Sequence, residues 1–202
     1  MVDWVHSITQ PFSGTKNILN FLVLAVLNAF WFLLLPAVIV NGYLVRFVQN
    51  VYQAKKELPE WPTFEWHEWW YMLKHGFFFT LISFIYLAVP FVIAYFGAAG
   101  TLPLWFVLLA FLLFFVLIFI LPMALVYYAT TENIWQAFNF PEIFSAIFKK
   151  IVPYLLACLL WFIFFVLAIF LGNYLSYFSG LVLVYPTMFI LNACAQILAE
   201  EQ

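Results

Sequence analysis

The chain has 202 residues, of which 68% are hydrophobic and only 8% are charged. Soluble domains carry about 25% charged residues, so this composition is typical of a membrane protein, and we expect one polytopic domain over residues 1–202. The net charge of −2, with seven Lys and Arg in all, leaves no basic stripe. Nucleic acid is therefore excluded as a partner.

The first apolar run follows a short N-terminal segment without a basic start or a small-residue cleavage site. We therefore expect no removable signal peptide. Residues 18–40 hold no charge, and at ~1.5 Å per residue this run can cross a ~30 Å hydrocarbon core. We expect it to be the first transmembrane helix, with Pro36 near its far end and a helical pattern that extends through Tyr43, Phe47 and Val51.

Residues 41–75 form a long polar island between apolar runs. Pro59 and Pro62 should stop any helix there. From Phe64 the tryptophans recur at helical spacing, which predicts an interfacial amphipathic helix over residues 64–75. The expected interface anchors of the island are Trp61, Trp66, Trp69 and Trp70, and its expected headgroup cations are Arg46, Lys55, Lys56 and Lys74.

Residues 76–128 carry no charge, and this run is long enough for about two transmembrane helices. The cluster of Gly and Pro at 97–103 should separate those two helices. We expect helices near 76–96 and 102–128. A second amphipathic pattern predicts an interfacial helix at 140–150, with anchors Phe140 and Phe144 and cations Lys149 and Lys150. Further spans are expected near 151–171, with Pro153 in the first turn, and near 177–198.

The expected fold class is therefore an all-α membrane protein with about five transmembrane helices, two interfacial helices and a weak repeat of helical hairpins. With five spans, the island, the second polar patch and the C-terminus share one side, which holds six of the seven cations. The positive-inside rule places that side in the cytoplasm of a prokaryotic inner membrane, with the N-terminus opposite. The alternative is a first run that is re-entrant at Pro36, with the N-terminus inside.

Candidate ligand residues are few. His67 and His75 lie two turns apart, about 12 Å along a helix, which is too far for one zinc ion. We expect these histidines to be solvated at the interface, with ligation of a pigment or haem by one histidine as the alternative. Common nucleophile and nucleotide motifs are absent, so we expect no enzyme and no metal site.

The expected spans contain no ionisable residue, which argues against a proton-coupled pump. The polar residues inside them, Asn28, Thr80, Ser83 and Asn192, are expected to bond to neighbouring helices. The 27 phenylalanines offer rigid contact area for bound lipid, a pigment or a quinone, and nothing selects a cofactor among them.

Short motifs in the island and in the C-terminal apolar run resemble those of a known protein family. Gly42-Tyr43-Leu44-Val45-Arg46, then Leu58-Pro59-Glu60-Trp61, and later Tyr185-Pro186-Thr187 before a helix with Ala193 and Ala195, resemble a prokaryotic family of polytopic membrane proteins catalogued as domain of unknown function 4013. The resemblance implies a multi-pass fold and no particular chemistry.

For function, the absence of charge in the spans and of site motifs favours a non-enzymatic accessory or scaffold subunit. Such a subunit would pack against other membrane protein subunits in a larger complex, or organise lipid. The alternative is a lipid-handling or small-solute transport protein built on the repeated hairpins.

Overall fold

The computed structural model describes residues 3–9, 12, 14–29, 34–54, 62, 68–99, 103–175 and 179–200. All regular structure in these ranges is helical, which confirms the all-α fold class. The elements are α1 (Trp4–Thr9), α2 (Thr15–Ala29), α3 (Leu34–Ala54), α4 (Trp69–Ala98), α5 (Leu104–Thr131), the 3-10 helix η3 (Ile134–Phe138), α6 (Phe140–Lys149), α7 (Ile151–Leu175) and α8 (Ser179–Ala199).

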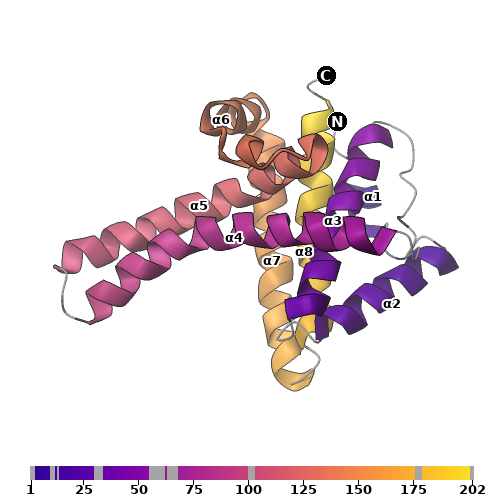
Figure 1. Cartoon of the computed structure of the whole chain (residues 1–202), viewed down its shortest axis with the longest axis horizontal. Coiled ribbons are helices and arrows are strands. Elements are labelled where there is room, and N and C mark those ends of the chain that lie inside the picture. Colours follow the sequence, from indigo (N-terminus) through magenta and orange to yellow (C-terminus); the bar gives the residue numbers. More distant parts are fainter. Residues whose placement is uncertain are drawn as a thin grey trace.

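Within these described residues, α3, α4, α5 and α7 are long and apolar enough to cross a membrane, and shorter apolar stretches lie at Asn17–Asn28 and Leu183–Ala199. Two helical hairpins organise the chain, α4 with α5 and α7 with α8. Figure 1 shows α4 and α5 extending together as an arm that runs across the direction of α7 and α8. The predicted break between the arm helices is confirmed, because α4 ends at Ala98 and Pro103 caps α5.

The first apolar run differs from the prediction of one helix over residues 18–40. It is divided between α2, which ends at Ala29, and α3, which begins at Leu34, and residues 30–33 lie outside the described ranges. Pro36 falls in the first turn of α3, where its missing N–H needs no partner. The pattern through Tyr43, Phe47 and Val51 does continue this helix, and all three side chains are buried.

The predicted interfacial helix at 64–75 also differs. Residues 64–67 lie outside the described part of the chain, and Trp69–His75 form the first two turns of α4, which continues into the membrane span without interruption. Gly76 does not end this helix, because it lies at a close helix crossing rather than at a turn. The second predicted interfacial segment, in contrast, is a separate helix, α6.

The crossing of α3 and α4 depends on two glycines that face each other's backbone. A Cβ atom on Gly76 would lie 1.8 Å from the carbonyl oxygen of Val38, and one on Gly42 would lie 1.9 Å from the carbonyl oxygen of Met72. Small residues let membrane helices approach in this way, which maximises van der Waals contact where no hydrophobic force drives association. The two glycines therefore determine how close α3 and α4 lie.

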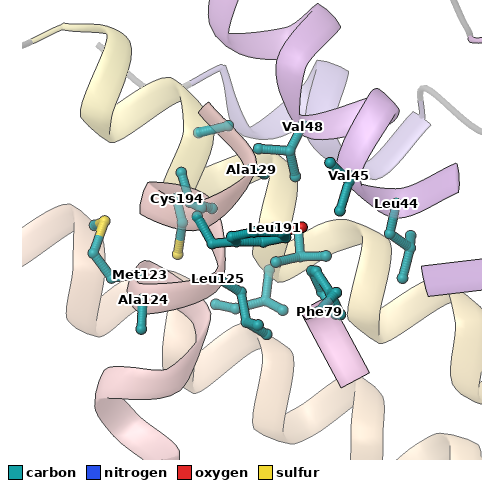
Figure 2. Close-up of a cluster of buried hydrophobic side chains, with 14 of the residues drawn as sticks. Leu44, Val45, Val48, Phe79, Met123, Ala124, Leu125, Ala129, Leu191 and Cys194 are labelled. Carbon is teal, nitrogen blue, oxygen red and sulfur yellow. The ribbon is translucent and has the colours of Figure 1, made fainter. Parts of the chain in front are cut away.

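The buried core lies where α3, α4, α5 and α8 meet. Figure 2 shows Val45 and Val48 of α3, Phe79 of α4, and Leu125 and Ala129 of α5 gathered around Leu191 of α8. Each of these side chains is at most 6% exposed. The arm is thus anchored at its base, while its far end carries exposed apolar side chains.

Pro62 is the one residue described between positions 54 and 68 of the polar island, and it is buried. The carbonyl oxygen of Pro62 accepts hydrogen bonds from Asn20 Nδ2 at 3.1 Å and from the Tyr43 hydroxyl at 3.0 Å. Both donors are themselves buried. The island therefore folds back onto α2 and α3 at this point.

The two ends of the chain lie together. Asp3 N donates to Gln196 Oε1 at 2.8 Å, and Gln196 Nε2 donates to Ser7 Oγ at 3.1 Å. Figure 1 shows the N and C marks close together at the same end of the molecule. This contact favours an N-terminus on the same side as the C-terminus, as in the alternative above, over the expected N-terminus on the opposite side.

The second hairpin extends the expected boundaries. Helix α7 runs to Leu175, beyond the predicted end at 171, so residues 172–175, expected between the two spans, are helical. Residues 176–178 lie outside the described ranges. Pro153 falls in the first turn of α7, as predicted. In α8, Pro186 lies inside the helix.

Candidate functional site

A polar cluster lies where α3, α4 and the end of α5 meet. Its members recur at helical spacing on each element, so that each set shares one helix face. They are Arg46 and Gln49 of α3, Glu68, Tyr71 and His75 at the start of α4, and Tyr128 and Glu132 at the end of α5. We call these seven residues the polar clamp.

Arg46 is the cation of the polar clamp. Its Nη2 lies 2.9 Å from Glu68 Oε1, and the guanidinium carbon lies 4.1 Å from the centre of the Tyr71 ring. The side chain is 33% exposed, while its Nε atom is buried with no hydrogen-bond partner in the described structure. Arginine suits this position because its planar group can pair with a carboxylate and stack on a ring at once.

Glu132 is the acceptor that joins the three helices. Its Oε1 accepts a hydrogen bond from the Tyr71 hydroxyl at 2.6 Å and another from Gln49 Nε2 at 2.9 Å. Gln49 Nε2 also donates to the carbonyl oxygen of Ala129 at 2.9 Å. The hydrogen bond from Tyr71 is the main cause that lowers the pKa of Glu132, so the carboxylate stays ionised.

The backbone of Glu132 is in the left-handed region, with φ of 54°, and its N–H donates to the carbonyl oxygen of Tyr128. This conformation ends α5 in the manner that glycine usually supplies. A non-glycine residue pays a conformational cost there of order 1 kcal/mol or more. The hydrogen bonds to Tyr71 and Gln49 offset that cost.

His75 is buried in the polar clamp, at 4% exposure. Its Nδ1 lies 3.0 Å from the Tyr128 hydroxyl, its Nε2 lies 3.7 Å from Glu132 Oε2, and its ring stacks on Tyr71 at 4.1 Å. The expectation of a histidine solvated at the interface is therefore wrong, because the crossing of α4 over α5 covers the ring. To bind a pigment or haem, His75 would have to leave this packing.

Two potential metal ligands, His75 and Glu132, come together here. No group of three His, Cys, Asp or Glu gathers anywhere in the described ranges. The other candidate histidine, His67, lies outside the described residues, as do Trp61, Trp66, Lys55 and Lys56.

The remaining predicted residues lie at the surface. Trp70 is 78% exposed and Trp69 is partly buried, while Lys74 and Lys149 are exposed. Lys150 pairs with Glu200 at 3.0 Å, which joins the start of α7 to the end of α8. On α6, Phe140 and Phe144 are exposed together with Phe148, whereas Ile143, Ala146 and Ile147 of the opposite face are buried.

Of the polar residues expected to bond to neighbouring helices, Thr80 does so, whereas the hydrogen bonds of Ser83 and Asn192 given below lie within their own helices. Asn41 Nδ2 donates to Thr80 Oγ1 at 2.8 Å, and the Thr80 hydroxyl donates to the carbonyl oxygen of Gly76. Ser83 donates to the carbonyl oxygen of Phe79. Asn192 Oδ1 accepts a hydrogen bond from Gln196.

Sequence reasoning missed Gln49, Tyr71, Tyr128 and Glu132 as partners of Arg46 and His75. The available signal was that polar residues recur on one helix face beside the apolar runs, at positions 46 and 49, at 68, 71 and 75, and at 128 and 132. The missing information was which helices meet, since 22 to 83 residues separate the bonded partners.

The hydrogen bonds and the ion pair of the polar clamp tie three helices together. With its apolar helices, this arrangement defines an all-α multi-pass membrane protein. Residues 29–177 match the family described as Protein of unknown function (DUF4013), and the chain belongs to that family. No curated protein and no solved structure matches the chain.

Proposed function

We propose that this protein is a non-enzymatic accessory or scaffold subunit that packs against other subunits of a larger membrane complex. The observation that supports this role is the arm formed by α4 and α5 (Figure 1), whose buried contacts with the other helices, among the described residues, lie at its base. Its outer part exposes large apolar side chains on both helices, among them Phe84, Phe91 and Tyr95 of α4 and Trp105, Leu108, Phe111 and Leu112 of α5.

The arm also carries a groove suited to a transmembrane helix of a partner. The groove has a volume of about 180 Å³ and is apolar. The small side chains of Ala94 and Ala110 lie in it beside Phe91, Phe111 and Phe114. Small residues at membrane-helix surfaces permit close approach of another helix, and neighbouring large residues supply the contact area. A partner helix is therefore the occupant that we propose.

The proposed location is a prokaryotic inner membrane, with the polar clamp and both termini on the cytoplasmic side. Lys149 and Lys150 lie next to each other at the junction of α6 and α7, and Lys150 pairs with Glu200 near the C-terminus. Arg46 of α3 belongs to the polar clamp, and Lys74 of α4 precedes the clamp residue His75 in the chain. Cations of this kind are retained on the cytoplasmic side during insertion.

The experiment is purification of the tagged full-length chain from its native membranes in mild detergent, with quantification of co-purifying proteins. We expect one or more membrane proteins at fixed stoichiometry. Ala94→Trp, which fills the groove, should reduce that capture several-fold. Leu159→Trp places the same ring at an exposed position of α7, outside the arm, and should not. Elution of the chain alone, or equal capture by both variants, would overturn the proposal.

A further inference from the structure

A cavity outside the polar clamp and the arm lies between α2, α3, α7 and α8. Its volume is about 380 Å³, within the range of small-molecule sites. Its lining joins three uncharged polar side chains, those of Asn28, Asn41 and Thr187, to five apolar ones, those of Val40, Leu44, Phe165, Leu183 and Val184.

We propose that this cavity binds an uncharged lipid whose head presents a hydroxyl or carbonyl oxygen. The inference concerns a different face of the molecule from the scaffold role and does not depend on it. Small-molecule sites characteristically combine an apolar wall with a few placed polar groups. Here the polar groups belong to α2, α3 and α8, so a single ligand head would bridge three helices.

The hydrogen-bonding capacity of the lining supports a hydroxyl or carbonyl head. One N–H of Asn41 donates to Thr80 Oγ1 at 2.8 Å, which leaves a second N–H and the carbonyl oxygen of the amide. The Thr187 hydroxyl donates to the carbonyl oxygen of Leu183 at 3.1 Å, and its oxygen can still accept. The cavity thus offers both a donor and acceptors, which a hydroxyl can satisfy together.

The charge of the ligand follows from the same residues. None of the described residues that line the cavity is ionisable, and an unpaired charge within a membrane costs several kcal/mol. An anionic or cationic head would find no counterion in this cavity, whereas an incompletely bonded amide favours any neutral group that completes its hydrogen bonds. A neutral lipid therefore fits the site better than a fatty acid or a charged phospholipid.

The test uses the full-length protein in nanodiscs and three photoreactive probes of equal chain length, each with the same diazirine: a long-chain alcohol, the corresponding carboxylic acid and the corresponding alkane. Labelled residues are mapped by mass spectrometry. We expect saturable labelling by the alcohol at the cavity residues, competed by unlabelled alcohol and at least several-fold stronger than labelling by the acid or the alkane.

Two variants and a control complete the experiment. Thr187→Val keeps the side-chain shape, removes the hydroxyl and should lower cavity labelling several-fold. Val184→Phe fills the cavity and should lower it further. Val166→Phe makes the same change at an exposed position of α7 and should leave labelling unchanged. Uniform labelling of lipid-facing helices, equal labelling by all three probes, or unchanged labelling in folded Thr187→Val would overturn the proposal.

Discussion

The close crossing of α3 and α4 predicts that Gly76→Ala severely destabilises the protein. The added Cβ would lie 1.8 Å from the carbonyl oxygen of Val38 and 2.6 Å from the backbone nitrogen of Gly42. Contacts under 3.0 Å are essentially never seen for a real Cβ, so the two backbones must separate by about 1.2 Å. A backbone, unlike the end of a side chain, cannot move without its whole helix.

The size of this destabilisation follows from the interactions between α3 and α4 that the separation would weaken. Overpacking typically costs ~1–3 kcal/mol, and the same helix pair holds the Arg46–Glu68 ion pair and the hydrogen bond from Asn41 to Thr80. We expect a total loss of about 3 kcal/mol, after the gain in helix propensity from Gly to Ala of ~1 kcal/mol. For a chain of this length that corresponds to a fall in apparent Tm of roughly 6–12 °C.

The assay is thermal unfolding of the detergent-purified protein, followed by loss of the monodisperse peak in size-exclusion chromatography. Gly42→Ala should behave like Gly76→Ala, because its Cβ would lie 1.9 Å from the carbonyl oxygen of Met72. The double variant should cost less than the sum of the two, since both changes separate the same pair of helices.

Gly97→Ala is the matched control in the same helix. Its Cβ would meet a side-chain methyl of Val107 at 2.3 Å rather than a backbone atom. That methyl can give way near the end of the arm, so the change in stability should stay within about 1 kcal/mol. If Gly42→Ala and Gly76→Ala shift the apparent Tm no more than Gly97→Ala does, the close crossing of α3 and α4 is refuted.

Three further predictions concern the polar clamp, α6 and the termini. Because the pKa of Glu132 is lowered on folding, its contribution to stability is present above the unfolded pKa and is lost as the pH falls through the folded pKa. The side chain is 46% exposed, so solvent screens its interactions, and Glu132→Gln should remove at most about 1 kcal/mol at neutral pH. The variant should also weaken the acid limb, which is the dependence of unfolding on acidic pH. Ile147→Ala should cost about 2–4 kcal/mol in the same thermal assay because Ile147 is 1% exposed, whereas Phe148→Ala, at 68% exposure, should change the free energy of unfolding by less than about 0.5 kcal/mol. Fluorescent-protein fusions at the N-terminus and at the C-terminus should both report the same side of the membrane, because the two ends are hydrogen-bonded to each other.

Each of these predictions has a result that contradicts it. An acid limb that persists unchanged in Glu132→Gln would show that the stabilising carboxylate lies elsewhere. Equal losses for Ile147→Ala and Phe148→Ala would mean that α6 does not bury the face described above. The third prediction is contradicted if the C-terminal fusion is fluorescent and the N-terminal fusion is dark, while an alkaline phosphatase reporter is active at the N-terminus. Those results would show that the two ends lie on opposite sides of the membrane.

The sequence located the helices well wherever the controlling signal was local. The end of α4 near Gly97, the start of α5 after Pro103 and the start of α7 beside Pro153 all follow from residues that break or begin helices by their own chemistry. The first apolar run was harder. It has no charge and no glycine between residues 18 and 40, so nothing in its composition marks the division between α2 and α3.

The polar clamp could be anticipated only in part. Arg46 and His75 stand out in the sequence because charged and titratable residues are rare in this chain. The burial and the partners of these two residues cannot be predicted from the sequence, because Glu132 looks like any other polar residue that follows a span. The contact of Asp3 with Gln196 joins residues 193 positions apart, which no periodic pattern encodes.

By itself, the amino-acid sequence determined that this chain is an all-α membrane protein with paired hairpins, because span length, hydropathy and helix breakers act over a few turns. The tertiary structure alone decided that α3 and α4 approach to backbone contact at Gly42 and Gly76, that His75 is buried, and that the termini meet. These features arise from shape complementarity and hydrogen bonding between helices distant in the chain, where every apolar face is equally compatible with lipid until packing selects one neighbour.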